Sequence, residues 1–502
     1  MSKDHRGSGG AQPGDYQVPK YSRAAGITVY RRRRRMGRIF RAFVAIILVS
    51  IIGSAVVLFG RAYLDYDNLP FDIPELPNPS DADIGSETAQ PVRAAKMTVA
   101  SAGDIIMNSP VVESGRQESG YNFDHLFTNL SHELVAFDLR TVSQETALAG
   151  SAYGFGLSWP LNAPQELGRA IVASGFNVVL HATDHTLDTG YEGLHNELSW
   201  WHSELPNTPI LGVAEPDPIA NPGLSDYVNN VFTVDKDGFR VAILNHTIGV
   251  LDNDRAVVSS LDEEKVRQDV RKARDLGAEM IIACPHWGDE NLTLVSEEEE
   301  RYAKLYAELG VDVIVGTNPR VLQRVDILEG KAGHKTICFY SVGCVTSSLN
   351  PENFLGGIAE FTLSRAEGGA CQVTSAVLKP VVTFRAEGQA YSTYFLRDYS
   401  DELAWTGWDA IPRDTFQNSC IEILGPAYNP ETCELKVDLG IPEEPAAEEA
   451  PAEEAPAEEA PAEGEAPAEG EAPAEGEAPA EGEAPAEGEA PAEEAPAEAE
   501  AA

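Results

Sequence analysis

The chain has 502 residues and a formal net charge of −43. About half of that acidic excess comes from the last sixty or so residues, which contain Glu and no Lys or Arg, so the rest of the chain is only moderately acidic. This balance argues against a nucleic-acid partner, and the uneven composition indicates one folded region between two unlike tails.

The N-terminal region predicts a membrane anchor. A polar, Arg-rich segment (1–41) precedes the run AFVAIILVSIIGSAVVLFG (42–60), which carries no charge and is long enough to cross a hydrocarbon core of about 30 Å as a helix. Arginines before the run and acidic residues after it predict a cytoplasmic N-terminus and an extracellular main domain, by the positive-inside rule. A cleaved signal peptide is the alternative, but the leader is longer than such peptides usually are.

Two low-complexity segments flank the folded region. Residues 61–96 are rich in Pro and acidic residues, which predicts an extended linker. Residues 442–502 repeat APAEE and APAEGE units, which cannot bury enough apolar surface to fold, so we expect a disordered tail. That tail is either a solvated spacer, which we favour, or a segment that binds basic partners. The remaining chain divides into an expected main domain (97–385) and a C-terminal extension (386–441).

The middle of the chain alternates short apolar runs with helical patterns. Residues 96–105 read as a strand that enters a loop, and residues 164–185 read as helix, glycine, strand and loop. The same rhythm returns at 262–290 and at 296–320, each time with polar residues directly after the strand. This predicts an α/β domain, in which the loops at the carboxyl ends of the strands form the ligand-binding edge.

Polar clusters stand at four of these strand ends. They are residues 103–104, 143–145, 182–185 with Asp188, and 285–288. Taken singly, each has an ordinary structural explanation, because Asp after a strand often caps a turn and a buried His is usually only hydrogen-bonded. Together they supply carboxylates and imidazoles, which are the groups that hold a divalent metal and activate water.

These motifs resemble those of the CapA-type poly-γ-glutamate capsule-synthesis proteins, whose domain has the metallophosphoesterase fold. The matching segments read GDIIM (103–107), SQE (143–145), GFNVV (175–179), ATDHTLD (182–188) and HWGDE (286–290). The resemblance covers roughly residues 97–385. It implies an α/β/β/α sandwich, preceded here by the transmembrane helix and followed by the acidic tail.

The chain departs from that family at polar positions. The family pattern G-x-H-P-H-V-x-Q reads GTNPRVLQ at 316–323, so both histidines are replaced, by Asn318 and Arg320. The closing Y-S-L-G-N reads YSVGC at 340–344, and the Asn of N-L-E is Ser143. The framework of each motif is kept, so the resemblance supports the fold more strongly than the activity.

The resemblance also implies a set of site residues. Its metal positions correspond to Asp104 and Glu145 for one cation, and to Glu145, Asp184, His286 and Asn318 for the other. The second of these sets still supplies a ligand at each position and would hold one divalent cation. This mixture of ligands favours Mn²⁺ or Mg²⁺, with Zn²⁺ as a further option.

The place of a second metal falls to Arg320, which has no free lone pair with which to ligate a cation. We expect its guanidinium to lie between Asp104 and Glu145 as an ion pair, the alternative being a surface arginine. The catalytic positions implied by the resemblance are His185, Asp188 and Arg320, with His185 protonating a leaving oxygen or orienting a phosphate. Because a two-metal clamp would lose one metal, the sequence leaves hydrolysis open.

The sequence thus predicts a membrane-anchored protein for synthesis, export or attachment of a capsule or envelope polymer such as poly-γ-glutamate. Its expected partners are the anionic polymer or its synthase complex. A single-metal envelope phosphoesterase and a non-catalytic polymer-binding scaffold are the alternatives.

The six cysteines show no C-x-x-C spacing, and only Cys420 and Cys433 are close in sequence. Their pairing is left open. In the same C-terminal extension, Trp405 and Trp408 either cover an edge of the core or bind a partner, and the covering role is the commoner one.

Overall fold

The computed structural model of this chain places the central region and leaves the two ends of the sequence outside the description. The described residues are 92–156, 160–228, 231–251, 254–388 and 390–441. The predicted transmembrane run (42–60), the linker up to residue 91 and the acidic tail therefore lie outside the described residues. Within the described part, no helix has both the length and the apolar character needed to span a membrane.

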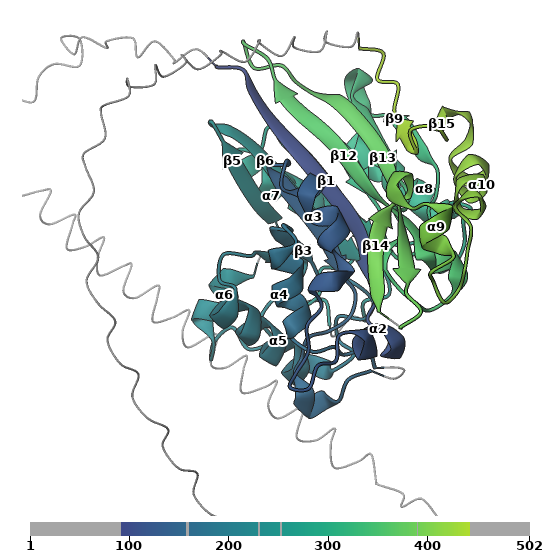
Figure 1. The fold of residues 1–502 in the computed structure, drawn as a ribbon. Coiled ribbons are helices and arrows are strands. Elements are labelled where there is room, and N and C mark those ends of the chain that lie inside the picture. Colours follow the sequence, from purple (N-terminus) through teal and green to yellow (C-terminus); the bar gives the residue numbers. More distant parts are fainter. Residues whose placement is uncertain (1–91, 157–159, 229–230, 252–253, 389, 442–502) are drawn as a thin grey trace, which may run out of the picture. The chain divides into compact units, whose positions relative to one another are not determined.

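The described chain forms one main compact unit, residues 95–365 with 371–441. Residues 92–94 and 366–370 belong to a second, small unit. The main unit contains two β-sheets (Figure 1).

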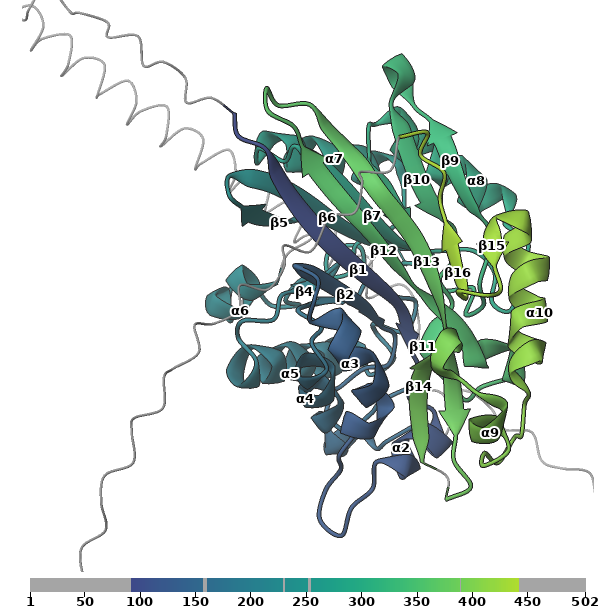
Figure 2. The same ribbon diagram turned by 45° about the horizontal axis from the view of Figure 1, so that its top comes forward.

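The first sheet is mixed. Its strands follow the order β15-β16-β13-β12-β1-β2-β3-β4, with β11 added to β1 and β14 added to β13. The strand bounds are β1 (Ala95–Ile105), β2 (Leu139–Gln144), β3 (Val178–Leu180), β4 (Ile210–Leu211), β11 (Cys344–Thr346), β12 (Leu355–Arg365), β13 (Cys371–Arg385), β14 (Tyr391–Phe395), β15 (Tyr428–Asn429) and β16 (Glu434–Lys436). Strands β1 to β4 are parallel, whereas β12 runs antiparallel to β1. Figure 2 shows β1, β12 and β13 side by side as the long centre of this sheet.

The second sheet has the order β5-β6-β7-β8-β10-β9. Its strands are β5 (Val231–Lys236), β6 (Phe239–Thr247), β7 (Met280–His286), β8 (Val313–Val315), β9 (Val325–Glu329) and β10 (Lys335–Phe339). The four inner strands are parallel, and the two edge strands β5 and β9 are antiparallel to their neighbours. The parallel strands of both sheets therefore bring several loops to one edge.

The described α-helices are α2 (Ser109–Ser114), α3 (Thr128–Leu134), α4 (Glu166–Ala173), α5 (Gly190–Glu204), α6 (Pro222–Tyr227), α7 (Glu263–Asp275), α8 (Glu297–Glu308), α9 (Asp401–Ala404) and α10 (Arg413–Leu424). Helices α3, α4 and α5 cover the outer face of the first sheet, and α7 and α8 cover that of the second. Both α7 and α8 begin at capped residues: Asp262 accepts the Lys265 N–H, and Ser296 forms a reciprocal capping box with Glu299.

The hydrophobic core is divided into layers by the period-two alternation of the strands. On β1, Met97 and Val99 belong to the core that the two sheets share, whereas Ala100 and Ala102 belong to the core beneath α3, α4 and α5. A third cluster packs the outer face of β6 and β7 against α7 and α8. The order helix, sheet, sheet, helix agrees with the predicted α/β/β/α sandwich.

The predicted helix-to-strand rhythm is confirmed in all three places. The segment 164–185 contains α4 and β3, the segment 262–290 contains α7 and β7, and the segment 296–320 contains α8 and β8. Each strand is fully buried, which explains its continuous apolar run.

The C-terminal extension is built into the first sheet. Strands β14 and β16 both pair with β13, and Phe416 on α10 enters the core shared by the two sheets. Trp405 and Trp408 are exposed, so the expected covering of the core falls to other side chains. Cys420 and Cys433 are buried free thiols in this structure, so the pairing that the sequence left open is not formed.

Candidate functional site

The predicted site residues lie at the carboxyl ends of parallel strands in both sheets. They are Asp104 on β1, Glu145 after β2, Asp184 and His185 after β3, His286 at the end of β7, and Asn318 and Arg320 after β8. The structure therefore joins residues more than two hundred positions apart, as the contact between Asp104 and Asn318 shows.

Two glycines allow the backbones to approach closely at this edge. A Cβ atom on Gly103 would lie 1.9 Å from the Gly343 carbonyl oxygen, and one on Gly316 would lie 1.9 Å from the Tyr340 carbonyl oxygen. Only glycine fits at such a distance. Because Gly103 precedes Asp104 and Gly316 opens the loop that carries Asn318 and Arg320, these contacts fix where the site side chains begin.

The Asp104 carboxylate is fully buried and only partly satisfied. Its Oδ2 accepts the backbone N–H of Asn318 at 3.0 Å. Its Oδ1 lies 3.6 Å from Nδ1 of His286 and has no hydrogen-bond partner. An unpartnered buried carboxylate oxygen costs free energy, so this atom can accept a cation in addition to the nearby His286 ring.

His286 connects two carboxylates across the site. Its Nδ1 lies 3.0 Å from the hydroxyl of Thr317, and its Nε2 lies 3.1 Å from Oδ1 of Asp184. Burial by itself lowers the pKa of His286, but Asp104 and Asp184 outweigh it and raise that pKa to about 10. For Asp184, burial raises the pKa, but the hydrogen bond from His286 prevails and the pKa is lowered. Asp184 is 33% exposed, so it marks the open side of the site.

Arg320 is buried and forms the centre of a second group. Its Nη2 contacts Oε1 of Glu145, and its Nη1 donates to Oε2 of Glu290 at 2.6 Å. The expectation that Arg320 lies between Asp104 and Glu145 is thus met only at Glu145, and Glu290 supplies the second carboxylate. The alternative of a surface arginine is wrong, because Arg320 is only 6% exposed.

The residues of the β8 loop adopt unusual backbone angles. Asn318 has φ 88° and Arg320 has φ 61°, both in the left-handed region. For a side chain as large as arginine this is uncommon, and such strain is held by surrounding contacts. Here the Arg320 carbonyl accepts the side-chain amide of Asn353 at 3.1 Å.

His185 and Asp188 form a hydrogen-bonded pair beside Arg320. The His185 Nδ1 lies 2.9 Å from Oδ2 of Asp188, which also accepts the backbone N–H of Leu161. The His185 Nε2 faces Nη2 of Arg320 at 3.0 Å and Oε1 of Glu145 at 3.2 Å. Burial lowers the pKa of His185, but the bond to Asp188 and the nearby carboxylates raise it overall.

Glu145 lies between the two groups and is fully buried. Burial and then the charge of Asp104 raise its pKa to about 7, against the opposing effect of Arg320. Its Oε2 has no hydrogen-bond partner. A carboxylate in this position gains from any further cation.

The donor set fits one divalent cation. Ligand atoms of Glu145, Asp184 and His185 lie within 4.8 Å of one another; Glu145 and Asp184 are predicted ligands, whereas His185 was predicted to be catalytic. Three buried oxygens at this edge also lack partners: Asp104 Oδ1, Glu145 Oε2 and Asn318 Oδ1. The Asn318 amide nitrogen donates to the carbonyls of Trp287 and Gly288, which leaves its oxygen as the free atom. Carboxylate, amide and imidazole donors are ligands of hard and borderline cations.

Sequence reasoning missed several residues that shape the site. Glu290 stands inside the HWGDE motif, but no role was predicted for it. His181 was not singled out, and the structure buries it completely: its Nδ1 lies 2.9 Å from the carbonyl of Gln144, and its Nε2 lies 3.4 Å from Glu197. The Gln144 amide also donates to Glu197 at 2.5 Å. These contacts hold the chain directly before Glu145.

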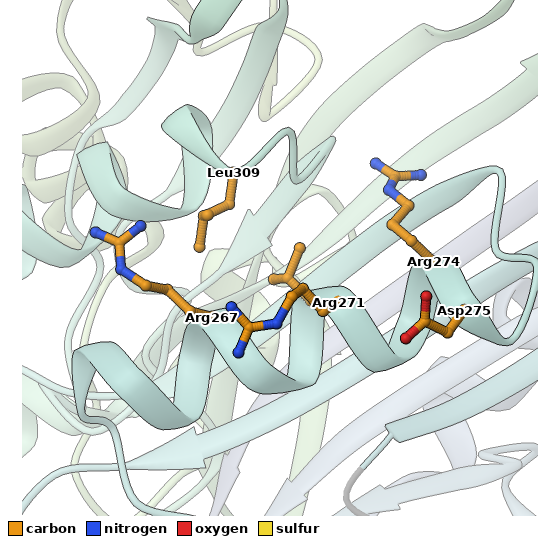
Figure 3. A pocket seen from close by; sticks show the side chains of 6 residues that line it. Arg267, Arg271, Arg274, Asp275 and Leu309 are labelled. Carbon is orange, nitrogen blue, oxygen red and sulfur yellow. The ribbon is translucent and has the colours of Figure 1, made fainter.

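A hollow on the outer face of α7 lies apart from these residues (Figure 3). Its volume is about 380 Å³, and its lining includes Arg267, Arg271, Arg274 and Leu309. Arg274 donates to the Gly310 carbonyl at 2.7 Å, while Arg271 projects from the helix. The hollow contains none of the predicted site residues.

The fold and the site together define an α/β protein with carboxylates, imidazoles and one arginine at the shared edge of two sheets. The profile of the family described as Bacterial capsule synthesis protein PGA_cap matches residues 98–347. The chain is 25% identical over 267 residues to Capsule biosynthesis protein CapA of Bacillus anthracis, covering 49% of this chain and 59% of that protein. It is 24% identical over 189 residues to PGA biosynthesis protein CapA of Bacillus subtilis (strain 168), covering 36% and 46%. The chain belongs to the CapA type of capsule biosynthesis proteins.

The matches span about half of the length of these curated relatives. Among solved structures, the chain is similar to a 5'-nucleotidase precursor from Thermus thermophilus, at 14% identity and a TM-score of 0.37, covering 65% of this chain and 58% of that one.

Proposed function

We propose that this chain is a membrane-anchored protein that takes part in synthesis, export or attachment of an anionic envelope polymer such as poly-γ-glutamate. Support comes from the family match over residues 98–347 and from the printed names of the two relatives. The anchor and the extracellular position of the main domain rest on the uncharged run 42–60 and the arginines before it.

The proposed site holds one divalent cation, Mn²⁺, Mg²⁺ or Zn²⁺. The residues that would hold it are Asp104, Glu145, Asp184, His286 and Asn318. The contact between Arg320 and Glu145 is the observation that carries this proposal. The guanidinium supplies a permanent positive charge on one side of Glu145. Oε2 of the same carboxylate has no hydrogen-bond partner, so a cation can bind there. A bound cation would polarise a ligand oxygen as a Lewis acid.

The protein side chains would orient an anionic ligand around this centre. Arg320 carries a fixed charge, and it is held by Glu145 on one side and Glu290 on the other. The Asp188 carboxylate orients the His185 ring through Nδ1, so that Nε2 faces the site. His185 is therefore placed to hold a proton close to a bound oxygen.

A single-metal envelope phosphoesterase is a second candidate. The hydrogen-bonded pair of His185 and Asp188 favours it, because a general acid must be oriented by a further group. Against it stands Arg320, which occupies a place where a two-metal hydrolase would use a second cation. A non-catalytic polymer-binding scaffold needs the charges of the site but no proton transfer.

The test is the polymer content of the host after deletion of this gene. Anionic polymer in the envelope would be measured as glutamate released by acid hydrolysis, in the deletion strain and after return of the full chain or its Asp184→Ala, His286→Ala variant. We expect polymer loss on deletion, recovery with the wild-type chain and no recovery with the double variant. An Asp289→Asn chain is the matched control, because Asp289 is an exposed acid on the neighbouring loop.

Unchanged polymer in the deletion strain would refute the capsule role. Recovery by the double variant would keep that role but favour the scaffold. Turnover of a phosphodiester such as bis-p-nitrophenyl phosphate by the wild-type chain, lost in the double variant, would favour the phosphoesterase.

A further inference from the structure

The Glu290 carboxylate is the exposed partner of a buried cation. Its Oε2 lies 2.6 Å from Nη1 of Arg320, and the two side chains differ strongly in exposure, 45% for Glu290 and 7% for Arg320. The other partner of the guanidinium, Glu145, is fully buried. One side of Arg320 is thus fixed inside the protein, while the other is covered by a carboxylate that reaches solvent.

The loop that carries Glu290 is held by atoms other than this carboxylate. The backbone N–H of Asn291 donates to the Pro319 carbonyl at 2.8 Å, and its side-chain oxygen accepts from Asn353 at 2.9 Å. The Gln323 amide donates to the Leu292 carbonyl at 3.0 Å. Glu290 can therefore turn away from Arg320 by side-chain rotation, without displacement of the loop backbone.

Arg320 itself stays in place when Glu290 leaves. Its Nη2 remains on Glu145 and near Nε2 of His185, and its backbone carbonyl accepts from Asn353. A buried guanidinium nitrogen left without an acceptor is costly, so departure of Glu290 requires another oxygen acceptor. The planar guanidinium matches carboxylate and phosphate oxygens, which makes an oxyanion the natural replacement.

We infer that Glu290 occupies an oxyanion subsite on Arg320, and that the carboxylate or phosphate of a ligand enters by displacing the Glu290 side chain. The inference rests on the proposed function only in that the ligand is anionic. It adds that the ligand replaces the Glu290 carboxylate and that the Arg320 guanidinium binds the ligand. Exchange of one acceptor for another costs little here, because the Glu290 end of the ion pair reaches solvent.

The test is anion titration of the purified full chain by calorimetry, with inorganic phosphate in one arm and glutarate in the other. Glu290→Gln keeps the size of the side chain but removes the competing charge, so we expect it to bind at least one of the two anions about tenfold more tightly than wild type. The arm that shows the gain identifies phosphate or carboxylate as the ligand class.

Two matched variants separate this effect from general charge. Asp289→Asn removes the same charge from the same loop, and Arg271→Gln removes an exposed arginine from the hollow on α7. We expect both to bind within about twofold of wild type, since such a change corresponds to less than about half a kcal/mol.

Equal affinity of wild type and Glu290→Gln in both arms would overturn the inference. An equal gain in affinity in Asp289→Asn would also overturn it, because the effect would then come from the overall negative charge of the loop. Loss of binding in Arg271→Gln would overturn it by placing the anion at the hollow on α7. The melting temperature verifies that Glu290→Gln is folded, and the metal content of each sample is measured alongside. A chain that restores the polymer and holds metal, but shows no gain in Glu290→Gln, retains the proposed function and loses only this subsite.

Discussion

The guanidinium of Arg320 contacts the carboxylate of Glu145, and both side chains are buried at the edge where the two sheets meet. Glu145 follows β2 of the first sheet, and Arg320 follows β8 of the second. Their contact therefore ties the two sheets together at the site. The charge of Arg320 therefore contributes to the stability of the fold as well as to the site, and its effect on the free energy of unfolding can be measured.

Removal of the Arg320 charge should destabilise the protein strongly. Arg320→Gln leaves Glu145 buried beside Asp104 without its cation. Loss of one partner of a buried ion pair costs up to about 3–5 kcal/mol, less the part that Glu145 recovers by taking up a proton, because its pKa is already raised to about 7. Glu145→Gln should relieve part of that cost in the double variant. Chemical denaturation of wild type, the two single variants and the double variant measures the coupling free energy between Arg320 and Glu145. Strictly additive effects would mean that the pair does not act as a unit.

The close approach of two backbone segments beside the site depends on glycine at position 316. Gly316→Ala would place a methyl group 1.9 Å from the Tyr340 carbonyl oxygen, so we expect a loss of about 3 kcal/mol in the free energy of unfolding. Gly223→Ala is the control, because nothing lies within 4 Å of a Cβ at this position on α6. The control should change stability by no more than about 1 kcal/mol, in the stabilising direction. Equal effects of both changes would contradict the close approach.

A buried carboxyl group away from the site predicts a pH dependence. Burial raises the pKa of Asp312 to about 6, although its Oδ2 accepts the Ile281 N–H at 2.7 Å. In the unfolded chain the pKa of an Asp is about 3.9, so the folded state binds the proton more tightly. This group therefore lowers the free energy of unfolding progressively as pH rises from about 4 to about 6, and its effect is constant above that range.

Asp312→Asn should remove this decline and keep the acceptor for Ile281. Relative to wild type, the variant should be equally stable near pH 4 and more stable by about 1–3 kcal/mol at pH 7. Denaturation of the two chains at several pH values gives the difference directly, because other acids titrate equally in both. A constant difference between pH 4 and pH 7 would show that Asp312 is not perturbed.

Much of the architecture follows from local sequence signals. Strand β7 and helix α7 were predicted correctly because a buried parallel strand is a continuous apolar run, and because the segment before it has the spacing of an amphipathic helix. The grouping of Asp104, Glu145, Asp184 and His286 was predictable because each follows or ends such a strand. Their roles as metal ligands stay a prediction.

Other features depend on contacts that no local pattern reveals. Glu290 pairs with Arg320 thirty positions away, and the second partner of Arg320 was assigned to Asp104 because the loop geometry is not encoded in the motif. Glu197 lies on the buried face of α5, where an acid is tolerated only because His181 and Gln144 contact it. Pairing of β14 and β16 with β13 likewise joined the C-terminal extension to the first sheet.

The metal content of the purified full chain, measured by mass spectrometry beside two variants, tests directly whether the edge shared by the two sheets holds one cation. Arg320 stands where the family pattern has a histidine, so we expect about one divalent cation per wild-type chain and about two when Arg320→His restores a ligand. We expect almost none in the Asp184→Ala, His286→Ala variant, with circular dichroism to verify folding. The same metal content in all three chains, or none in any of them, would contradict the claim that this edge holds one cation beside a built-in arginine.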